Sequence, residues 1–271
     1  TQKHTRTPVQ SYHPSVSSSL ISMTDHLTKG RLILGIGSGA NRSDIDAIGL
    51  LKKDNYKIML ESYEIIKKII YDKTTNINTN NFEINLKKTQ NKKLGLGYFN
   101  NLYKDRKNLE IIMPALNYNS YNVEICAKNK WSIAISNFCS DEVVFNHIER
   151  YLHFSKLKKK DALKKIKLTK LIYLNKKDYL AEKYLFNKKS PHLFTVKTIF
   201  EKLRQFNKHQ CFGDNVKTIQ QAVENTVMFG SPKKIKSEVN KINKKFGTLG
   251  SLIYVAVPKT NKKIYDNSLE L

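Results

Sequence analysis

A short glycine-rich segment, Gly37-Ser38-Gly39-Ala40, ends a run of apolar residues that begins after Arg31. Glycines at the carboxyl end of a strand let the backbone approach a ligand, and free backbone N–H groups there can bind an anion such as a phosphate. The segment lacks the G-x-G-x-x-G spacing of dinucleotide-binding loops, so an ordinary tight turn is the alternative interpretation. Residues 37–40 are therefore candidate cofactor-binding residues.

A second candidate for chemistry is His13, which precedes Pro14. An imidazole that faces a cavity can act as an acid, a base or a hydrogen-bond donor near neutral pH. The alternative is a turn histidine without a chemical role. We expect His26 to be structural, because it falls on a helix before the next strand, and Ser43-Asp44 to form a helix N-cap that braces the loop.

Other common catalytic and metal-binding patterns are missing from the sequence. It contains no Ser-His-Asp set, HExxH, P-loop or paired carboxylates. The three cysteines, Cys126, Cys139 and Cys211, are far apart and form no CxxC, which argues against a zinc site or a disulfide framework. We expect them to be buried free thiols in a reducing cytoplasm, and we expect no metal.

The formal charge of +25 raises the question of nucleic-acid binding. Only six of the 48 basic residues are Arg, and the 42 Lys are mixed with Asn, Ile and Tyr, which AT-rich codons encode. Since Arg makes the bidentate phosphate and guanine contacts, base bias explains the charge better than a nucleic-acid partner. No stretch of about 18 apolar residues exists, so we expect no membrane partner either.

Apolar periodicity predicts strands that alternate with helices within a single domain over residues 1–271. Residues 74–108 form a long polar excursion, and 187–225 is an ambiguous insertion with some helical spacing at 196–206. Ser231, Pro232 and Gly247 are typical of the N-cap, first turn and end of a helix. The predicted strands are 31–37, 109–116, 131–135, 166–174 and 249–257, and the predicted helices are 54–71, 123–129, 142–157, 178–186 and 232–246. This alternation favours a parallel sheet, but it does not distinguish an open sheet from a closed barrel.

Read in order, the motifs of residues 12–49 resemble the bacterial luciferase-like monooxygenase family. They are Tyr12-His13-Pro14, Asp25-His26-Leu27-Thr28-Lys29-Gly30-Arg31, Leu34-Gly35-Ile36-Gly37-Ser38-Gly39-Ala40, Ser43-Asp44 and Gly49. Weaker matches are Phe229-Gly230-Ser231-Pro232, similar to the entry to the last helix of the family, and Phe246-Gly247-Thr248-Leu249-Gly250-Ser251-Leu252, similar to the entry to its eighth strand.

The resemblance implies an α/β fold, a TIM (β/α)₈-barrel of the luciferase-like type with its site at the carboxyl ends of the strands. Aligned in this way, the chain lacks about the first two βα units, which we interpret as an N-terminal truncation.

The resemblance also implies a flavin-dependent monooxygenase that uses reduced FMN and dioxygen to oxygenate a small organic substrate. A separate flavin reductase would supply the reduced FMN, and a homodimer is left open. The family places polar cofactor contacts after the fifth strand, which here are Asn117, Tyr118 and Ser120, although Tyr118 is bulkier than the residues usual there. The alternatives are a deazaflavin-dependent oxidoreductase of the same fold and a non-catalytic, degenerate flavin-binding barrel fragment.

Overall fold

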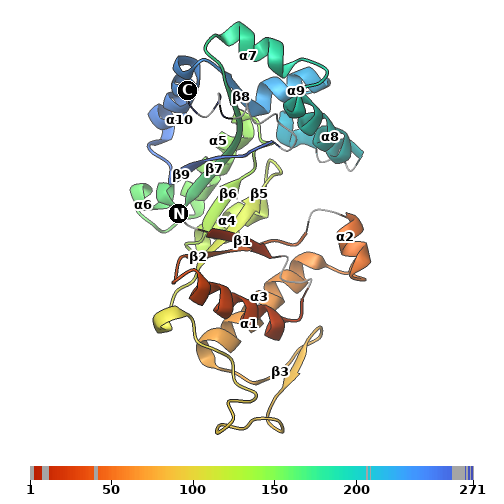
Figure 1. Cartoon of the computed structure of the whole chain (residues 1–271), viewed down its shortest axis with the longest axis vertical. Coiled ribbons are helices and arrows are strands. Elements are labelled where there is room, and N and C mark those ends of the chain that lie inside the picture. Colours follow the sequence, from red (N-terminus) through yellow and green to blue (C-terminus); the bar gives the residue numbers. More distant parts are fainter. Residues whose placement is uncertain are drawn as a thin grey trace. The chain divides into compact units, whose positions relative to one another are not determined.

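The chain divides into two compact units, Thr1–Ile112 and Met113–Leu271, in a computed structural model (Figure 1). The structure describes residues 3–7, 12–39, 42–205, 207, 209–257, 266, 268 and 270.

The first unit is built on a parallel sheet in the order β1–β2–β5. In the register, Lys3 pairs with Leu32 and Ile33 pairs with Glu110. Its elements are β1 (Lys3–Thr7), α1 (Pro14–Leu27), β2 (Leu32–Ile36), α2 (Arg42–Ala47), α3 (Asn55–Asp72), β3 (Asn76–Asn78), β4 (Glu83–Asn85), the 3₁₀ turn η2 (Tyr103–Asp105) and the first half of β5 (Glu110–Ala115).

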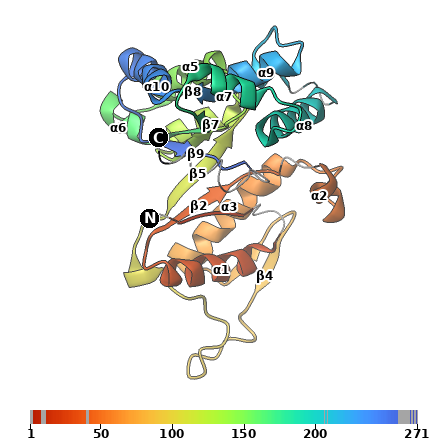
Figure 2. The same ribbon diagram turned by 45° about the horizontal axis from the view of Figure 1, so that its top comes forward.

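Helices α1 and α3 pack side by side in this unit (Figure 2). The Asp54 side chain accepts a hydrogen bond from Lys57 N and so caps α3, and the helix ends at Lys73 in the left-handed conformation. One face of α3 is apolar and buried, which is the signal that predicted this helix from the sequence.

The excursion 74–108 is more ordered than its polar sequence suggests. Strands β3 and β4 form an antiparallel hairpin in which Ile77 pairs with Ile84. Both isoleucines are buried against Ile65 and Ile69 of α3, with Phe82 packed beside them. The excursion therefore contributes its own small hydrophobic cluster.

The second unit continues β5 and adds β6, β7 and β8 in that order, with β9 paired to the first part of β7. All of the pairings β6–β7, β7–β8 and β7–β9 are parallel. Its elements are α4 (Tyr121–Lys128), β6 (Ser132–Ile135), α5 (Asp141–Phe154), α6 (Lys159–Lys164), β7 (Ile166–Leu174), α7 (Asp178–Leu185), α8 (Pro191–Gln205), η3 (His209–Phe212), α9 (Ile219–Thr226), β8 (Val227–Gly230), α10 (Pro232–Phe246) and β9 (Ser251–Tyr254).

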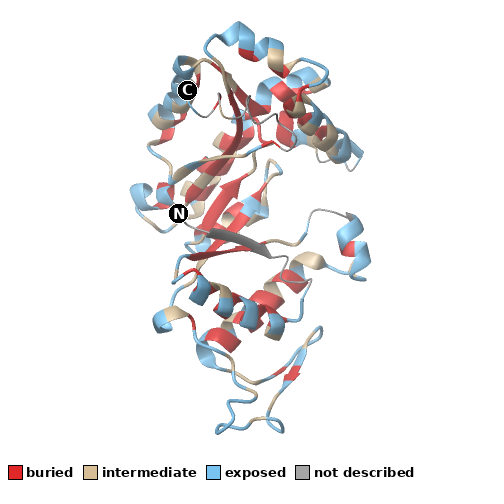
Figure 3. Cartoon of the chain, viewed as in Figure 1, coloured by how far each residue is buried: buried red, intermediate tan, exposed pale blue. Residues whose placement is uncertain are grey.

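The strand interiors form the core, and β2 and β6 are buried along their whole length (Figure 3). The predicted caps of α10 are confirmed, because the Ser231 side chain accepts from Lys234 N, Pro232 opens the helix and Gly247 ends it with φ +105°. The ambiguous insertion contains α8, η3 and α9, and the strand β8 that follows it was not predicted.

Candidate functional site

The loop after β2 is the first predicted cofactor contact. Gly37 and Ser38 are half-buried and Gly39 is exposed, whereas Ala40 lies outside the described residues. Gly39 has φ +78°, in the left-handed region that residues with side chains avoid. The chain therefore leaves the strand through two positions without side chains, which keeps its main chain accessible to a ligand.

Ser43 and Asp44 were expected to form a helix N-cap, but both lie inside helix α2, and the position before its first residue lies outside the described residues. Helix α2 begins at Arg42, so Ser43 and Asp44 lie in its first turn. An acidic residue in the first turn, here Asp44, interacts favourably with the helix dipole.

His13 is the N-cap residue of α1, and its Nδ1 accepts from Ser15 N at 3.4 Å. The same nitrogen lies 2.6 Å from the Ser15 hydroxyl. The imidazole edge also packs on Phe82, with the ring centroids 5.8 Å apart. These contacts give His13 a structural role as the residue that caps the start of α1.

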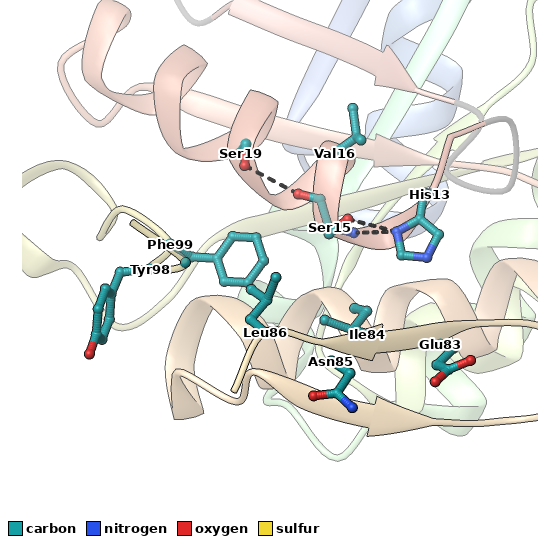
Figure 4. A pocket seen from close by; sticks show the side chains of 11 residues that line it. His13, Ser15, Val16, Ser19, Glu83, Ile84, Asn85, Leu86, Tyr98 and Phe99 are labelled. Carbon is teal, nitrogen blue, oxygen red and sulfur yellow. Dashed lines mark hydrogen bonds between the residues drawn. The ribbon is translucent and has the colours of Figure 1, made fainter. Parts of the chain in front are cut away.

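His13 also lines a cleft of about 380 Å³ between α1 and the segments around β4 and Tyr98 (Figure 4). The cleft combines the His13 ring and the hydroxyls of Ser15 and Ser19 with the apolar side chains of Val16 and Phe99. The cleft is lined by α1 and by the excursion, and a chemical role for His13 stays a prediction.

His26 has the structural role that was expected of it. Its Nε2 lies 3.1 Å from the Asn101 carbonyl oxygen, and its ring packs edge-on against Tyr103. These contacts tie the end of the excursion to α1.

Asn117, Tyr118 and Ser120 form the turn between β5 and α4 in the second unit. Asn117 is exposed, and its carbonyl oxygen accepts a hydrogen bond from Ser120 N at 3.0 Å. Ser120 is the N-cap residue of α4, but its hydroxyl makes no capping hydrogen bond. Tyr118 is half-buried. The turn thus presents an amide and a hydroxyl that the helix does not use.

A residue that the sequence analysis missed, His147, positions this turn. Its Nε2 lies 2.8 Å from the Asn117 carbonyl oxygen, so the Nε2–H donates to it. The side chain is buried in α5, and desolvation lowers the pKa of His147, which favours the neutral ring. Its position on the apolar face with Val143 and Val144 is the sequence signal that could have identified it.

The loop between β6 and α5 supports the same turn from another side. The Cys139 thiol donates to the Leu116 carbonyl oxygen at 3.4 Å. In turn, the buried Lys170 ammonium of β7 donates to the Cys139 carbonyl at 3.1 Å and lies 3.3 Å from Asp141 Oδ1. Burial raises the pKa of the Cys139 thiol, which keeps it protonated.

Within the described part of the chain, no group of three or more His, Cys, Asp or Glu residues is placed to bind a metal ion. Among the same residues, no helix is both long enough and apolar enough to cross a bilayer.

The chain is similar to known proteins in part of its sequence and in its fold. The family model described as luciferase-like monooxygenase matches residues 5–92. No curated protein sequence matches the chain significantly.

Solved structures share the fold at low sequence identity. One is the oxygenating constituent of 3,6-diketocamphane monooxygenase from Pseudomonas putida in complex with FMN, with a TM-score of 0.80 and 16% identity over 97% of this chain and 75% of that chain. A monooxygenase from Streptomyces bottropensis has a TM-score of 0.65 and 15% identity, over 97% of this chain and 73% of its own. An F420-dependent secondary alcohol dehydrogenase in complex with an F420–acetone adduct has a TM-score of 0.59 and 10% identity, over 96% of this chain and 74% of its own.

These comparisons show a sequence similarity to luciferase-like monooxygenases over residues 5–92 and a fold shared with the solved structures. The predicted fold class is confirmed, since the parallel α/β architecture is that of luciferase-like TIM-barrel structures. The motifs of residues 12–49 indicated a resemblance to the luciferase-like monooxygenase family. The match of the family model to residues 5–92 confirms this resemblance.

Proposed function

We propose that this chain acts as a flavin-dependent monooxygenase, using reduced FMN and dioxygen to oxygenate a small organic substrate. The observation that carries the proposal is the backbone of the loop after β2, where Gly39 has φ +78°. This loop lies inside the segment 5–92 that matches the luciferase-like monooxygenase model. A main chain free of side chains at the carboxyl end of a parallel strand is suited to bind an anionic cofactor.

Each of the two sets of candidate residues, taken within its own unit, offers groups of the kind that bind a flavin nucleotide. In the proposal, the backbone of Gly37, Ser38, Gly39 and Ala40 and the side chains of Asn117, Tyr118 and Ser120 hold it. The Ser120 hydroxyl makes no capping bond and the Asn117 side chain is exposed, so both polar groups can bind a phosphate or a ribityl hydroxyl.

Reduced flavin, when bound, supplies the electrons for activation of dioxygen. The protein binds and orients the cofactor and the substrate. We assign the role of hydrogen-bond donor to His13: because Nδ1 accepts the capping bond from Ser15 N, Nε2 carries the proton of the neutral ring and is the atom that can donate to a substrate or cofactor. The braced turn 117–120 keeps its polar groups in place without reorganisation.

The proposal includes three partners, namely a small organic substrate, dioxygen and a separate flavin reductase in the cytoplasm. We propose neither a nucleic-acid nor a membrane partner.

A second candidate is a deazaflavin-dependent oxidoreductase, which transfers hydride and not oxygen. The specific observation in its favour is the shared fold with the F420-dependent secondary alcohol dehydrogenase. A third is a non-catalytic flavin-binding protein, for which the bulky Tyr118 in the turn is the argument.

Titration of the purified chain with oxidised FMN, anaerobically reduced FMN and coenzyme F420 tests the proposal. Quenching of Trp131, the only tryptophan, and cofactor fluorescence report binding. We expect FMN to bind more tightly than F420, and turnover of reduced FMN with dioxygen to oxygenate a substrate panel. Tighter binding of F420 favours hydride transfer, flavin binding without oxygenation favours the non-catalytic protein, and no binding of either overturns all three.

The loop itself is tested with a matched glycine pair. Gly39 and Gly49 both have a left-handed backbone, with φ +78° and +70°. Substitution by Ala at either strains the backbone by roughly 1 kcal/mol, but only Gly39→Ala adds a methyl group at the proposed cofactor contact. We expect Gly39→Ala to weaken FMN binding about tenfold or more and Gly49→Ala to leave it unchanged. Equal effects would contradict the assignment of the loop.

A further inference from the structure

A pocket of the second unit shares no lining residue with the proposed flavin contacts. It has a volume of about 580 Å³ and lies between helix α6 and the segment 247–250, which joins α10 to β9 (Figure 1). Its lining residues Lys164 and Gly250 come shortly before β7 and β9, so the pocket lies at the amino ends of these two parallel strands. The volume falls in the usual range for small-molecule sites, about 300–1,000 Å³.

The two walls of the pocket are tied together by the backbone. Gly250 N donates to the carbonyl oxygens of Leu163 at 2.9 Å and of Ile166 at 3.1 Å. A side chain has no room at Gly250, because its Cβ would overlap the Lys164 carbonyl oxygen. At the other end of the segment, a Cβ added to Gly247 would lie 3.0 Å from Leu163 Cδ1. The segment and α6 are therefore in close contact, which makes the pocket a preformed feature of the second unit.

The floor of the pocket is apolar. It is formed by Leu163 and Phe246, which are buried, and by Leu249, which is half-buried. The Phe246 ring packs against Phe145, with the ring centroids 5.4 Å apart. A flat apolar group that covers this floor is removed from water, which favours binding. The floor thus offers a place for the apolar part of a ligand.

The rim of the pocket is basic. Lys159, Lys160 and Lys164 of α6 line it, and the exposed Thr248 adds a hydroxyl on the opposite side. Lys164 forms an ion pair with Asp161 at 3.0 Å, whereas Lys159 and Lys160 have no acidic partner among the described residues. Two adjacent ammonium groups repel each other, and an anion bound at both of them relieves this repulsion.

Lysines are more concentrated around this pocket than in the chain as a whole. Residues 156–167, which run through α6 into β7, contain seven Lys and one acidic residue, Asp161. The whole chain contains 42 Lys among 271 residues. A general excess of Lys codons raises the number of lysines along the entire chain, so it does not account for this local density. The positive potential of the segment attracts anions toward the pocket.

We propose that this pocket binds a small organic phosphate with a ring-containing, apolar body, the chemistry of a nucleoside phosphate. The phosphate lies at Lys159 and Lys160, and the ring covers the floor formed by Leu163, Phe246 and Leu249. Two unpaired ammonium groups favour a doubly charged phosphate over a single carboxylate. An extended polyanion would reach only the rim, whereas a small molecule also uses the floor.

Isothermal titration calorimetry with three probes tests the proposal. The probes are ADP, which has both parts, adenosine, which lacks the phosphates, and pyrophosphate, which lacks the ring. We expect ADP to bind at least about tenfold more tightly than either of the other two. Equal affinity for ADP and one of its parts overturns the proposal, and so does the absence of ADP binding at millimolar concentration. A short single-stranded oligonucleotide that binds more tightly than ADP would assign the surface to an extended polyanion instead.

A matched pair of double variants locates the site. Lys159→Gln/Lys160→Gln removes both unpaired ammonium groups and is expected to weaken ADP binding about tenfold or more. The control is Lys188→Gln/Lys189→Gln, which removes the same charge from two exposed lysines outside the pocket and should keep the affinity within about twofold. Circular dichroism verifies that both proteins fold. Equal losses in the two variants would show that ADP responds to the net charge of the protein and not to this pocket.

Two single variants separate the floor from the proposed cofactor loop. Leu249→Glu places a carboxylate in the floor and is expected to weaken ADP binding, so an unchanged affinity would contradict the position of the ring. Gly39→Ala, which we expect to weaken FMN binding, should leave the affinity for ADP as it is. A loss of ADP binding in Gly39→Ala would place ADP at the cofactor loop and overturn the proposal, whereas failure of FMN to bind leaves the ADP result unaffected.

Discussion

The Nε2 nitrogen of His147 lies 2.8 Å from the carbonyl oxygen of Asn117, 30 residues earlier in the chain. The imidazole is buried in α5, whereas the carbonyl belongs to the turn with Tyr118 and Ser120. A side chain from α5 thus holds the turn that we propose to contact the cofactor. The relationship also defines the tautomer of the ring, because Nε2 must carry the proton to donate.

We predict that His147→Leu lowers the free energy of unfolding by about 1–3 kcal/mol, since it removes a buried hydrogen bond and changes the packing of α5. The loosened turn is expected to weaken FMN binding as well. Urea denaturation and FMN titration measure the two effects. The control is His147→Gln, whose side-chain amide can donate from nearly the same position and should retain more of both. If Leu and Gln at this position behave alike, the hydrogen bond is not what holds the turn.

Acid should destabilise the second unit through His192. This side chain is buried against Tyr173 and Tyr184, and neither of its ring nitrogens has a hydrogen-bond partner among the described residues. Desolvation lowers the pKa of His192 from 6.5 to about 4. Because the folded state binds the proton more weakly than the unfolded state, this stabilisation is complete above pH 6.5 and is lost as the pH falls toward 4.

Protonation of His192 therefore lowers the free energy of unfolding by roughly 3 kcal/mol between pH 7 and pH 4. We predict that His192→Phe removes this part of the pH dependence, as measured by urea denaturation at several pH values. His147 contributes in the same direction, because its pKa is also lowered by burial. The exposed His153 serves as control, and His153→Phe should leave the pH profile as it is. An unchanged profile in His192→Phe would assign the acid sensitivity to other groups.

The sequence predicts those elements whose signal is local. The apolar run Leu32–Ile36 predicts β2, because a strand interior depends on adjacent residues. Both ends of α10 are predicted in the same way by the cap residues Ser231, Pro232 and Gly247. Strand β8 (Val227–Gly230) is only four residues long and follows α9 directly, so its short apolar run carries no recognisable period.

The remaining differences come from contacts between distant residues. Ile77 and Ile84 sit among Asn and Thr, and their burial depends on Ile65 and Ile69 of α3, so the hairpin looks like a polar loop in the sequence. For the candidate site, the motifs predicted the loop after β2 and the turn after β5 as cofactor contacts, and this stays a prediction. The supports of that turn, His147 and the pair Lys170–Asp141, could not be predicted from spacing.

We predict that all three cysteines are unreactive in the folded protein. Each is buried, and burial raises the pKa of the Cys211 thiol to about 12 and shifts the pKa values of Cys126 and Cys139 in the same direction. Since the thiolate is the reactive form, labelling by a thiol reagent at pH 8 should be slow and become rapid and complete in denaturant. The time course of absorbance with an aromatic disulfide reagent measures this. Rapid labelling of one thiol without denaturant would show that one of these side chains is accessible.

A buried ion pair holds the end of the excursion to the rest of the first unit. The Asp25 carboxylate is fully buried in α1 and accepts hydrogen bonds from Tyr103 N and Arg106 Nε, both at 2.9 Å. Arg106 Nη2 also donates to Asp25 and to the Leu32 carbonyl at the start of β2. One carboxylate and one guanidinium therefore connect α1, the 3₁₀ turn η2 and β2.

Because the carboxylate has no access to water, removing only its cationic partner should be very unfavourable. We predict that Arg106→Met lowers the free energy of unfolding by about 3–5 kcal/mol, the usual cost of an unpaired buried charge. The double variant Asp25→Asn/Arg106→Met no longer buries an unpaired charge and should be more stable than Arg106→Met alone. Lys104→Met, which removes a nearby cation without an ion pair to Asp25, is the control and should change stability by less than about 0.5 kcal/mol. Thermal and urea denaturation of the four proteins gives the comparison. A double variant less stable than Arg106→Met would mean that the hydrogen bond from Tyr103 N to the carboxylate, and not the ion pair, dominates the stability of this junction.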